Sequence, residues 1–251
     1  MTASSEQFLF SYFLVFCRVG IAFNLMPAMG GTRYPPMVRL LLAFGISLSV
    51  TPLVSASNQL QQFGTSDRIE AIFFETIAGF LIGFWCSCFA YSVRFAGAFI
   101  VNAIGLAGIP GQPIDEQEPS SHIATLLSLA LTAMIFATGL HLQSIAAVVE
   151  SYSIFPIGAP LAPQMLARTT TELLGRCFFL GLQFSSPFLV FSMIWNFALG
   201  LANRMTPQLS VYFAFSGILT MAGLAILAVV APKLLYTSLS AYADFLSNGF
   251  Q

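Results

Sequence analysis

The sequence predicts an all-helical protein whose hydrophobic helices associate with a membrane. Of the 251 residues, 57% are hydrophobic and only 8% are charged, whereas about 25% of a soluble domain is usually charged. Such a chain cannot cover its apolar surface with polar groups, so lipid or partner proteins must cover it. The net charge of −1 gives no electrostatic footprint for nucleic acid, and we expect no nucleic-acid partner.

Six apolar stretches follow one another along the chain and predict the helices. A helix needs about 20 apolar residues to cross a bilayer, and several stretches reach or exceed this length. Breaks rich in proline and glycine separate some of them, because proline in a helix interior removes a hydrogen bond and kinks or breaks the helix. Two such breaks read MPAMGGTRYPPMVR and FPIGAPLAP. The stretches cover roughly 7–29, 37–55, 69–108, 122–153, 164–204 and 209–246.

Charged or titratable side chains lie inside these stretches, among them Arg18, Glu75, Arg94, His141 and Arg176. A charge at the centre of a bilayer costs about 2.5–3.5 kcal/mol on insertion scales. A bundle surrounded only by lipid is therefore unfavourable, and helices packed inside a protein assembly are favoured. Glu75 and Arg94 lie about 28 Å apart along one straight helix, so these two cannot pair unless the chain folds back.

Small residues recur at every fourth position of the third stretch, in AGFLIGFWCSC. They are Gly79, Gly83 and Ser87. At this spacing small side chains form a ridge that another helix backbone can approach closely. The sequence leaves open whether that helix belongs to this chain or to a partner subunit.

No arrangement typical of an active site or a metal centre occurs in the sequence. The only two histidines, His122 and His141, lack the spacing of a zinc motif. A G-x-S-x-G motif and a phosphate-binding glycine-rich loop are both missing. The four cysteines lie inside apolar runs, which favours buried thiols. We therefore predict a non-enzymatic protein with no catalytic residue, no metal and no cofactor.

One polar segment interrupts the apolar pattern, IGLAGIPGQPIDEQEPSSH at 104–122. Three of the ten acids of the chain, Asp115, Glu116 and Glu118, fall within four positions of it. Carboxylates can hold a hard cation, although a solvated turn is the favoured interpretation. The residues themselves leave open a plain outer loop, an acidic binding site and a moving part.

The join between the last two stretches carries the most specific pattern. In LGLANRMTPQLSVYFAFSGILTMAGL, Arg204 closes one apolar helix, and Pro207 and Gln208 precede the next. Arg18 in a phenylalanine-rich first helix, the Pro/Gly break, LLLAFGISLSVTP, AGAFIVNAIGLAG and ATGLH come earlier in the chain. Their order resembles the FliR/SctT family of the export gate of flagella and type III secretion systems, over nearly the whole chain.

The resemblance implies a fold and an assembly. The fold would combine a FliP-like helical part, 1–160, with a FliQ-like helical hairpin, 161–251, folded at the turn formed by Arg204, Pro207 and Gln208. FliP-like and FliQ-like subunits would join it in a helically arranged, funnel-shaped gate in the bacterial inner (cell) membrane, at the flagellar basal body. Such a gate would bind a FlhB-like protein, lie near a FlhA-like protein and pass unfolded polypeptides.

The resemblance also implies that 105–121 reaches into the channel and helps to plug it. Glycine would give this loop backbone freedom, and proline would stop the helix from continuing. A plain connector is the alternative, and the role of the acids stays open. The expected plug residues are Gly105, Gly108, Ile109, Pro110, Gly111, Gln112, Pro113, Asp115, Glu116 and Glu118.

A second group of residues is expected to make contacts between helices or between subunits. The arginines among them would form polar ties. The group comprises Arg18, Glu75, Gly79, Gly83, Arg94, His141, Arg176, Arg204, Pro207 and Gln208.

A small secondary transporter is the main alternative, since it would use intramembrane Arg and Glu residues as a substrate or proton path. Transporters usually contain two similarly broken repeats, and the prolines and charges of 1–125 and 126–251 do not correspond. A gate subunit is therefore favoured. Between a flagellum and an injectisome, we favour the flagellum.

Overall fold

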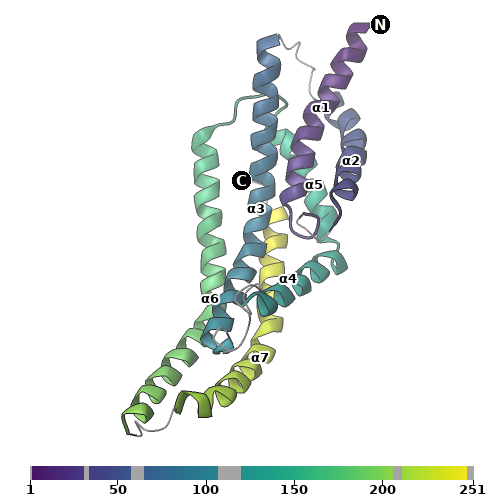
Figure 1. Ribbon diagram of the computed structural model, residues 1–251. Helices are drawn as coiled ribbons and strands as arrows, with labels where there is room; N and C mark the ends of the chain where they lie inside the picture. Colours follow the sequence, from purple (N-terminus) through teal and green to yellow (C-terminus); the bar gives the residue numbers. More distant parts are fainter. Residues whose placement is uncertain (1, 31–33, 58–64, 107–119, 206–210, 248–251) are drawn as a thin grey trace. The chain divides into compact units, whose positions relative to one another are not determined.

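The computed structural model describes residues 2–30, 34–57, 65–106, 120–205 and 211–247, and all their regular structure is helical (Figure 1). This confirms the predicted all-helical class. Within these ranges there are seven α-helices. They are α1 (Thr2–Leu25), α2 (Pro36–Ser57), α3 (Thr65–Ala103), α4 (Ser120–Ala137), α5 (Leu140–Ile154), α6 (Pro163–Met205) and α7 (Val211–Ser247).

Five of these helices are long and apolar enough to cross a membrane. They are α1, α2, α3, α6 and α7. The helices α4 and α5 pass the same test only as a pair, which gives up to six spans in the described part of the chain. The predicted association with a membrane follows directly from these lengths.

The apolar stretch over 122–153 forms two helices, α4 and α5, rather than one. The two helices meet at 75° across a short break. At the break Gly139 has φ 75°, a left-handed conformation, which glycine adopts without steric cost. The hydroxyl of Thr138 donates a hydrogen bond back to the carbonyl of Met134 at 2.8 Å. Apolar residues continue on both sides, so hydrophobicity gave no sign of the bend.

The chain forms two compact units. Unit 1 comprises Met1–Cys88, Thr132–Leu174 and Tyr242–Gln251, and unit 2 comprises Phe89–Leu131 and Gly175–Ala241. The helices α3, α4, α6 and α7 therefore contribute residues to both units. The predicted division into 1–160 and 161–251 rests on resemblance to FliP-like and FliQ-like subunits. The two compact units do not test that resemblance, so the division stays a prediction.

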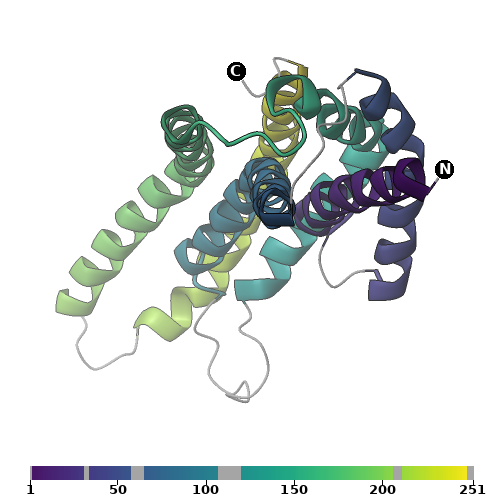
Figure 2. The same cartoon turned by 90° about the horizontal axis from the view of Figure 1, so that it is seen from above.

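In unit 1, α1 and α2 pack against each other and appear side by side in both views (Figures 1 and 2). The hydroxyl of Tyr12 donates to the carbonyl of Phe44 at 3.1 Å. Further polar contacts tie other helices of the unit together. The indole nitrogen of Trp85 on α3 donates to Thr170 on α6 at 3.0 Å. The hydroxyls of Ser144 on α5 and Tyr242 on α7 hydrogen-bond at 2.6 Å.

In unit 2, the carboxy-terminal part of α3, together with the residue that follows it, contacts α4, α6 and α7. A Cβ atom added to Gly97 of α3 would lie 2.7 Å from the Cα atom of Ala124 on α4. Between α3 and α6, the rings of Phe95 and Phe178 lie 6.0 Å apart, centroid to centroid. The Thr220 hydroxyl of α7 donates to the carbonyl of Ile104 at 3.3 Å.

Candidate functional site

A buried ion pair joins α1 to α3 in unit 1. The side chains of Arg18 and Glu75 are each only 1% exposed. Nε of Arg18 donates to Oε2 of Glu75 at 2.7 Å, and Nη2 donates to Oε1 at 2.8 Å. This two-point geometry matches the fork of a guanidinium to a carboxylate. Because burial removes water from both ions, each charge depends on the other and on further hydrogen bonds.

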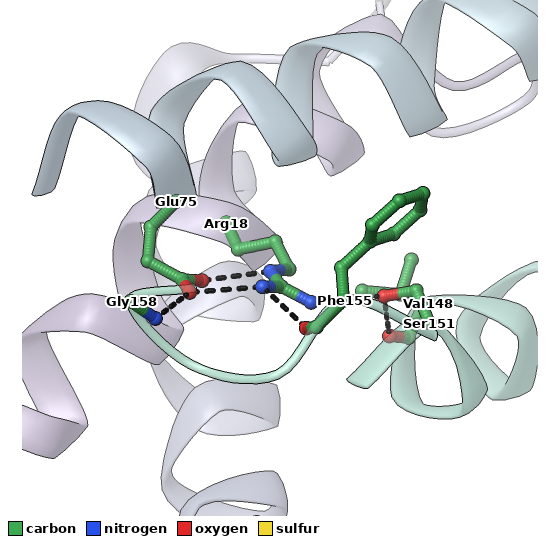
Figure 3. Close-up of polar contacts among 6 residues, drawn as sticks. All are labelled: Arg18, Glu75, Val148, Ser151, Phe155 and Gly158. Atoms are coloured by element: carbon green, nitrogen blue, oxygen red, sulfur yellow. Dashed lines mark hydrogen bonds and ion pairs between the residues drawn. The ribbon is translucent and has the colours of Figure 1, made fainter. Parts of the chain in front are cut away.

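Those further hydrogen bonds come from α5 and the turn that follows it (Figure 3). Arg18 donates through Nη2 to the carbonyl of Phe155 at 3.0 Å and through Nη1 to the hydroxyl of Ser151 at 3.3 Å. The backbone amide of Gly158 donates to Oε1 of Glu75 at 3.1 Å. The pair therefore holds the turn after α5 against α1 and α3. We call these five residues the Arg18 node.

An aromatic ring covers the guanidinium of the node. The Cζ atom of Arg18 lies 3.9 Å from the centroid of the ring of Tyr152, which is itself buried. A cation over the face of an aromatic ring is attracted by the negative potential of that face. Tyr152 thus contributes both apolar cover and electrostatic stabilisation to the buried charge.

The glycine ridge of α3 packs against the backbone of α1, beside the node. A Cβ atom on Gly79 would lie 2.4 Å from the carbonyl oxygen of Arg18, and one on Gly83 would lie 2.8 Å from that of Ala22. One turn further on, the hydroxyl of Ser87 donates to the carbonyl of Leu25. The helix that approaches this ridge therefore belongs to the same chain, which answers the question that the sequence left open.

The remaining predicted contact residues do not join the node. Arg94, Arg176 and Arg204 are exposed, and none of the described residues forms an ion pair or hydrogen bond with them. His141 lies at the start of α5, where its ring packs on Phe136 with centroids 5.0 Å apart. Its Nδ1 atom is buried without a hydrogen-bond partner among the described residues.

Most of the predicted plug and the predicted hairpin turn lie outside the described residues. Gly105 is described, and it follows α3 with φ 76°. A left-handed residue at this point ends the helix, as is common for glycine. The residues outside the described ranges are Gly108, Ile109, Pro110, Gly111, Gln112, Pro113, Asp115, Glu116, Glu118, Pro207 and Gln208.

The four cysteines are free thiols, and Cys86, Cys88 and Cys177 are buried. Across the described ranges, no three His, Cys, Asp or Glu residues are grouped so that they could hold a metal ion. The node itself is a structural arrangement, because its charged atoms are occupied by one another and by backbone groups. It holds helices together and presents no reactive group.

Arg18 and Glu75 stand out in the sequence, whereas the groups that complete their hydrogen bonding do not. Two of these groups, the carbonyl of Phe155 and the amide of Gly158, belong to the backbone. Any residue type carries such groups, so composition gives no sign of them. The only available signal was the break FPIGAPLAP, whose irregular backbone leaves carbonyl and amide groups free to bond elsewhere.

Comparison with known proteins identifies the family. The family model described as "Bacterial export proteins, family 1" matches residues 9–244. A flagellar biosynthetic protein FliR of Caulobacter vibrioides is 31% identical over 216 residues, which is 86% of each chain. The Escherichia coli protein of the same name is 27% identical over 92% of this chain and 89% of its own. The Aquifex aeolicus protein is 25% identical over 96% and 93%.

These matches confirm the resemblance that the motif order predicts. They also confirm the prediction of a non-enzymatic protein, because the matching family is one of export proteins. The family match covers far more than half of the chain, and it includes most of α1, all of α2 to α6 and most of α7. The chain therefore belongs to the bacterial export proteins, family 1.

Proposed function

We propose that this chain is a FliR-like, non-enzymatic subunit of a flagellar protein-export gate in the bacterial inner membrane. The observation that carries the proposal is the alignment of nearly the whole chain with proteins named flagellar biosynthetic protein FliR. Together with FliP-like and FliQ-like subunits, it would form the channel that unfolded substrates cross. The same family match favours a gate subunit over a small secondary transporter.

The exposed surface of the chain supports an assembly. Only 17% of the α7 span and 28% of the α2 and α6 spans are buried within the chain. Large apolar side chains are exposed on α2 and α6, including Met37, Leu41, Phe178 and Phe197. Lipid can cover some of these residues, but lipid does not suit the exposed arginines of α6. We infer that FliP-like and FliQ-like subunits cover part of this surface, and that a FlhB-like protein binds the gate with a FlhA-like protein nearby.

The carboxy-terminal part has the dimensions of a long helical hairpin. Two consecutive helices of 43 and 37 residues, α6 and α7, make up nearly all of 161–251. This length supports a FliQ-like hairpin after the FliP-like part, 1–160.

Arg94→Ala is expected to lower the yield of the intact gate without unfolding the chain. Arg94 is exposed within the α3 span and lacks a partner in the described part of its own chain, so we infer that it pairs across a subunit interface. Copurification of tagged chain with the FliP-like and FliQ-like subunits measures the effect. Arg168→Ala is the matched control, because Arg168 already pairs with Glu172 on its own helix at 2.9 Å. Equal yields from both variants would contradict the inference.

Deleting 109–117 is expected to leave the gate assembled but to make the inner membrane leaky to small solutes. The deletion removes the apolar Gly/Pro part of the proposed plug together with two of its acids. Solute uptake in cells that contain the assembled gate measures the leak. In a control variant the loop keeps its native length, and Asp115, Glu116 and Glu118 are changed to their amides. This variant separates the effect of the loop's charge on permeability from the effect of its bulk. Unchanged permeability after the deletion would identify 105–121 as a plain connector.

An export assay tests the proposed function itself. Cells that lack this chain should stop secreting flagellar proteins, and a plasmid copy should restore secretion. Normal secretion in cells without the chain would overturn the proposal.

A further inference from the structure

A polar stripe runs along the outward face of α5. Four exposed residues, Gln143, Ala146, Glu150 and Ser153, follow one another at intervals of three or four, which places them on one face of a helix. Gly139, at the amino-terminal end of α5, continues the same spacing. The opposite face carries the buried residues, and it includes Ser151 of the Arg18 node. We call Gly139, Gln143, Ala146, Glu150 and Ser153 the α5 stripe.

The stripe differs in chemistry from the outward face of α2. Of the large hydrophobic residues of α5, a helix that the structure describes completely, only Leu142 is exposed. On α2, by contrast, the exposed residues include Met37, Leu41 and Leu53. The face of α2 suits lipid, whereas the face of α5 carries an amide, a carboxylate and a hydroxyl.

The carboxylate of Glu150 lies near the middle of this face. It is exposed, and no hydrogen bond or ion pair reaches it from the described part of the chain. An ionised group facing acyl chains is strongly disfavoured, and such groups in membrane proteins usually face the protein interior or water. Glu150 therefore requires either an aqueous surface or a cation from outside the chain.

The break between α4 and α5 gives a second, independent indication of water. Ala137 and Thr138 are exposed, and a Cβ atom added to Gly139 would meet no atom within 4 Å. In a membrane protein, irregular backbone is tolerated only where protein buries it or where it lines a water-filled cavity. The described part of the chain leaves Ala137 and Thr138 of this break exposed and Gly139 half-buried, and the break adjoins the stripe.

We propose that the α5 stripe lines the water-filled conduit of the gate and contacts the exported polypeptide. This inference rests on the proposed function, and it identifies one surface that would line the channel of the gate. Water in the conduit solvates Glu150 and the open break. An unfolded chain of variable sequence passes most easily along a hydrated wall of small and polar groups, since such a wall offers no apolar pocket. Glu150 attracts the Lys and Arg side chains of the passing substrate.

Cysteine accessibility in the assembled gate tests the inference. Ala146→Cys places a thiol on the stripe, and Ala147→Cys is the matched control, because Ala147 is the adjacent alanine and is buried. Both are made in a Cys17→Ser parent, since Cys17 is the one of the four native thiols that is not buried. Gates purified with their FliP-like and FliQ-like subunits are treated with a charged, membrane-impermeant thiol reagent and, separately, with a lipophilic maleimide. A second sample contains a substrate stalled by a tightly folded fusion domain.

The charged reagent is expected to modify the Ala146→Cys variant and to leave the Ala147→Cys variant unmodified. The stalled substrate should abolish the reaction of the Ala146→Cys variant, because the substrate would lie against the stripe.

Three outcomes would overturn the inference. Reaction of the Ala146→Cys variant only with the lipophilic maleimide would place the stripe against lipid. Protection of its new thiol from both reagents would place the stripe under a partner subunit. A reaction that the stalled substrate leaves unchanged would show that the substrate does not contact the stripe. Failure to recover any complex would instead contradict the proposed function, so the two failures are distinguishable.

Discussion

Replacing Glu75 by alanine is expected to lower the free energy of unfolding of the chain by about 3–5 kcal/mol, because one partner of a buried ion pair is removed. Arg18 would stay buried behind α3 and Tyr152, and it would lose two hydrogen bonds of 2.7 and 2.8 Å. The Gly158 amide would lose its acceptor as well. Thermal unfolding in detergent and the amount of chain in membranes measure the effect.

Two control variants show whether the loss of stability in Glu75→Ala comes from the unpaired buried charge. Glu172→Ala removes an exposed pair with Arg168, and exposed pairs contribute only about 0–1 kcal/mol. Arg18→Met combined with Glu75→Leu removes both charges, so no unpaired ion remains buried. The double variant should therefore be more stable than Glu75→Ala. A Glu75→Ala chain as stable as the Glu172→Ala chain would show that the node does not hold the helices together.

Gly79→Ala is expected to destabilise the chain by about 1–3 kcal/mol, the usual cost of overpacking. The new methyl group would lie 2.4 Å from the carbonyl oxygen of Arg18 and 2.9 Å from its Cα atom. Both atoms belong to the backbone of α1, so no side-chain rotation relieves the clash. The displacement would also move the guanidinium of Arg18 away from Glu75. Thermal unfolding in the same detergent measures the loss.

Gly175→Ala on α6 is the matched control, since a Cβ atom there meets nothing within 4 Å. Alanine favours a helix over glycine by about 1 kcal/mol, so this variant should be neutral or more stable. The two substitutions are chemically identical, and only the contact with α1 separates them. A stabilised Gly79→Ala chain would contradict the close packing of α1 on the ridge.

The helices and their relation to the membrane could be predicted from the sequence because both depend on local composition. Long apolar stretches, some of them separated by Pro/Gly breaks, correspond to α1, α2, α3, α6 and α7. The bend at Gly139 could not be predicted in the same way. A glycine inside an apolar run is compatible with a continuous helix or with a left-handed residue, and packing beyond the run decides between them.

The candidate site was only partly predictable. Arg18 and Glu75 stood out as charges inside apolar stretches, but they lie 57 positions apart in the chain. Their pairing depends on how α1 packs on α3, which the ridge of Gly79 and Gly83 permits but does not specify. The stripe on α5 was missed because one glutamate among polar residues of a short helix resembles an ordinary solvated face. Only the burial of the opposite face of α5 and the exposed break between α4 and α5 distinguish the stripe from such a face.

Purification of the tagged chain from its native membrane, followed by native mass spectrometry, tests the central claim most directly. A gate subunit should be recovered in a hetero-oligomer with FliP-like and FliQ-like proteins, because large parts of α2, α6 and α7 are not buried within the chain. Recovery of a stable, monodisperse chain that binds no export protein would contradict the account.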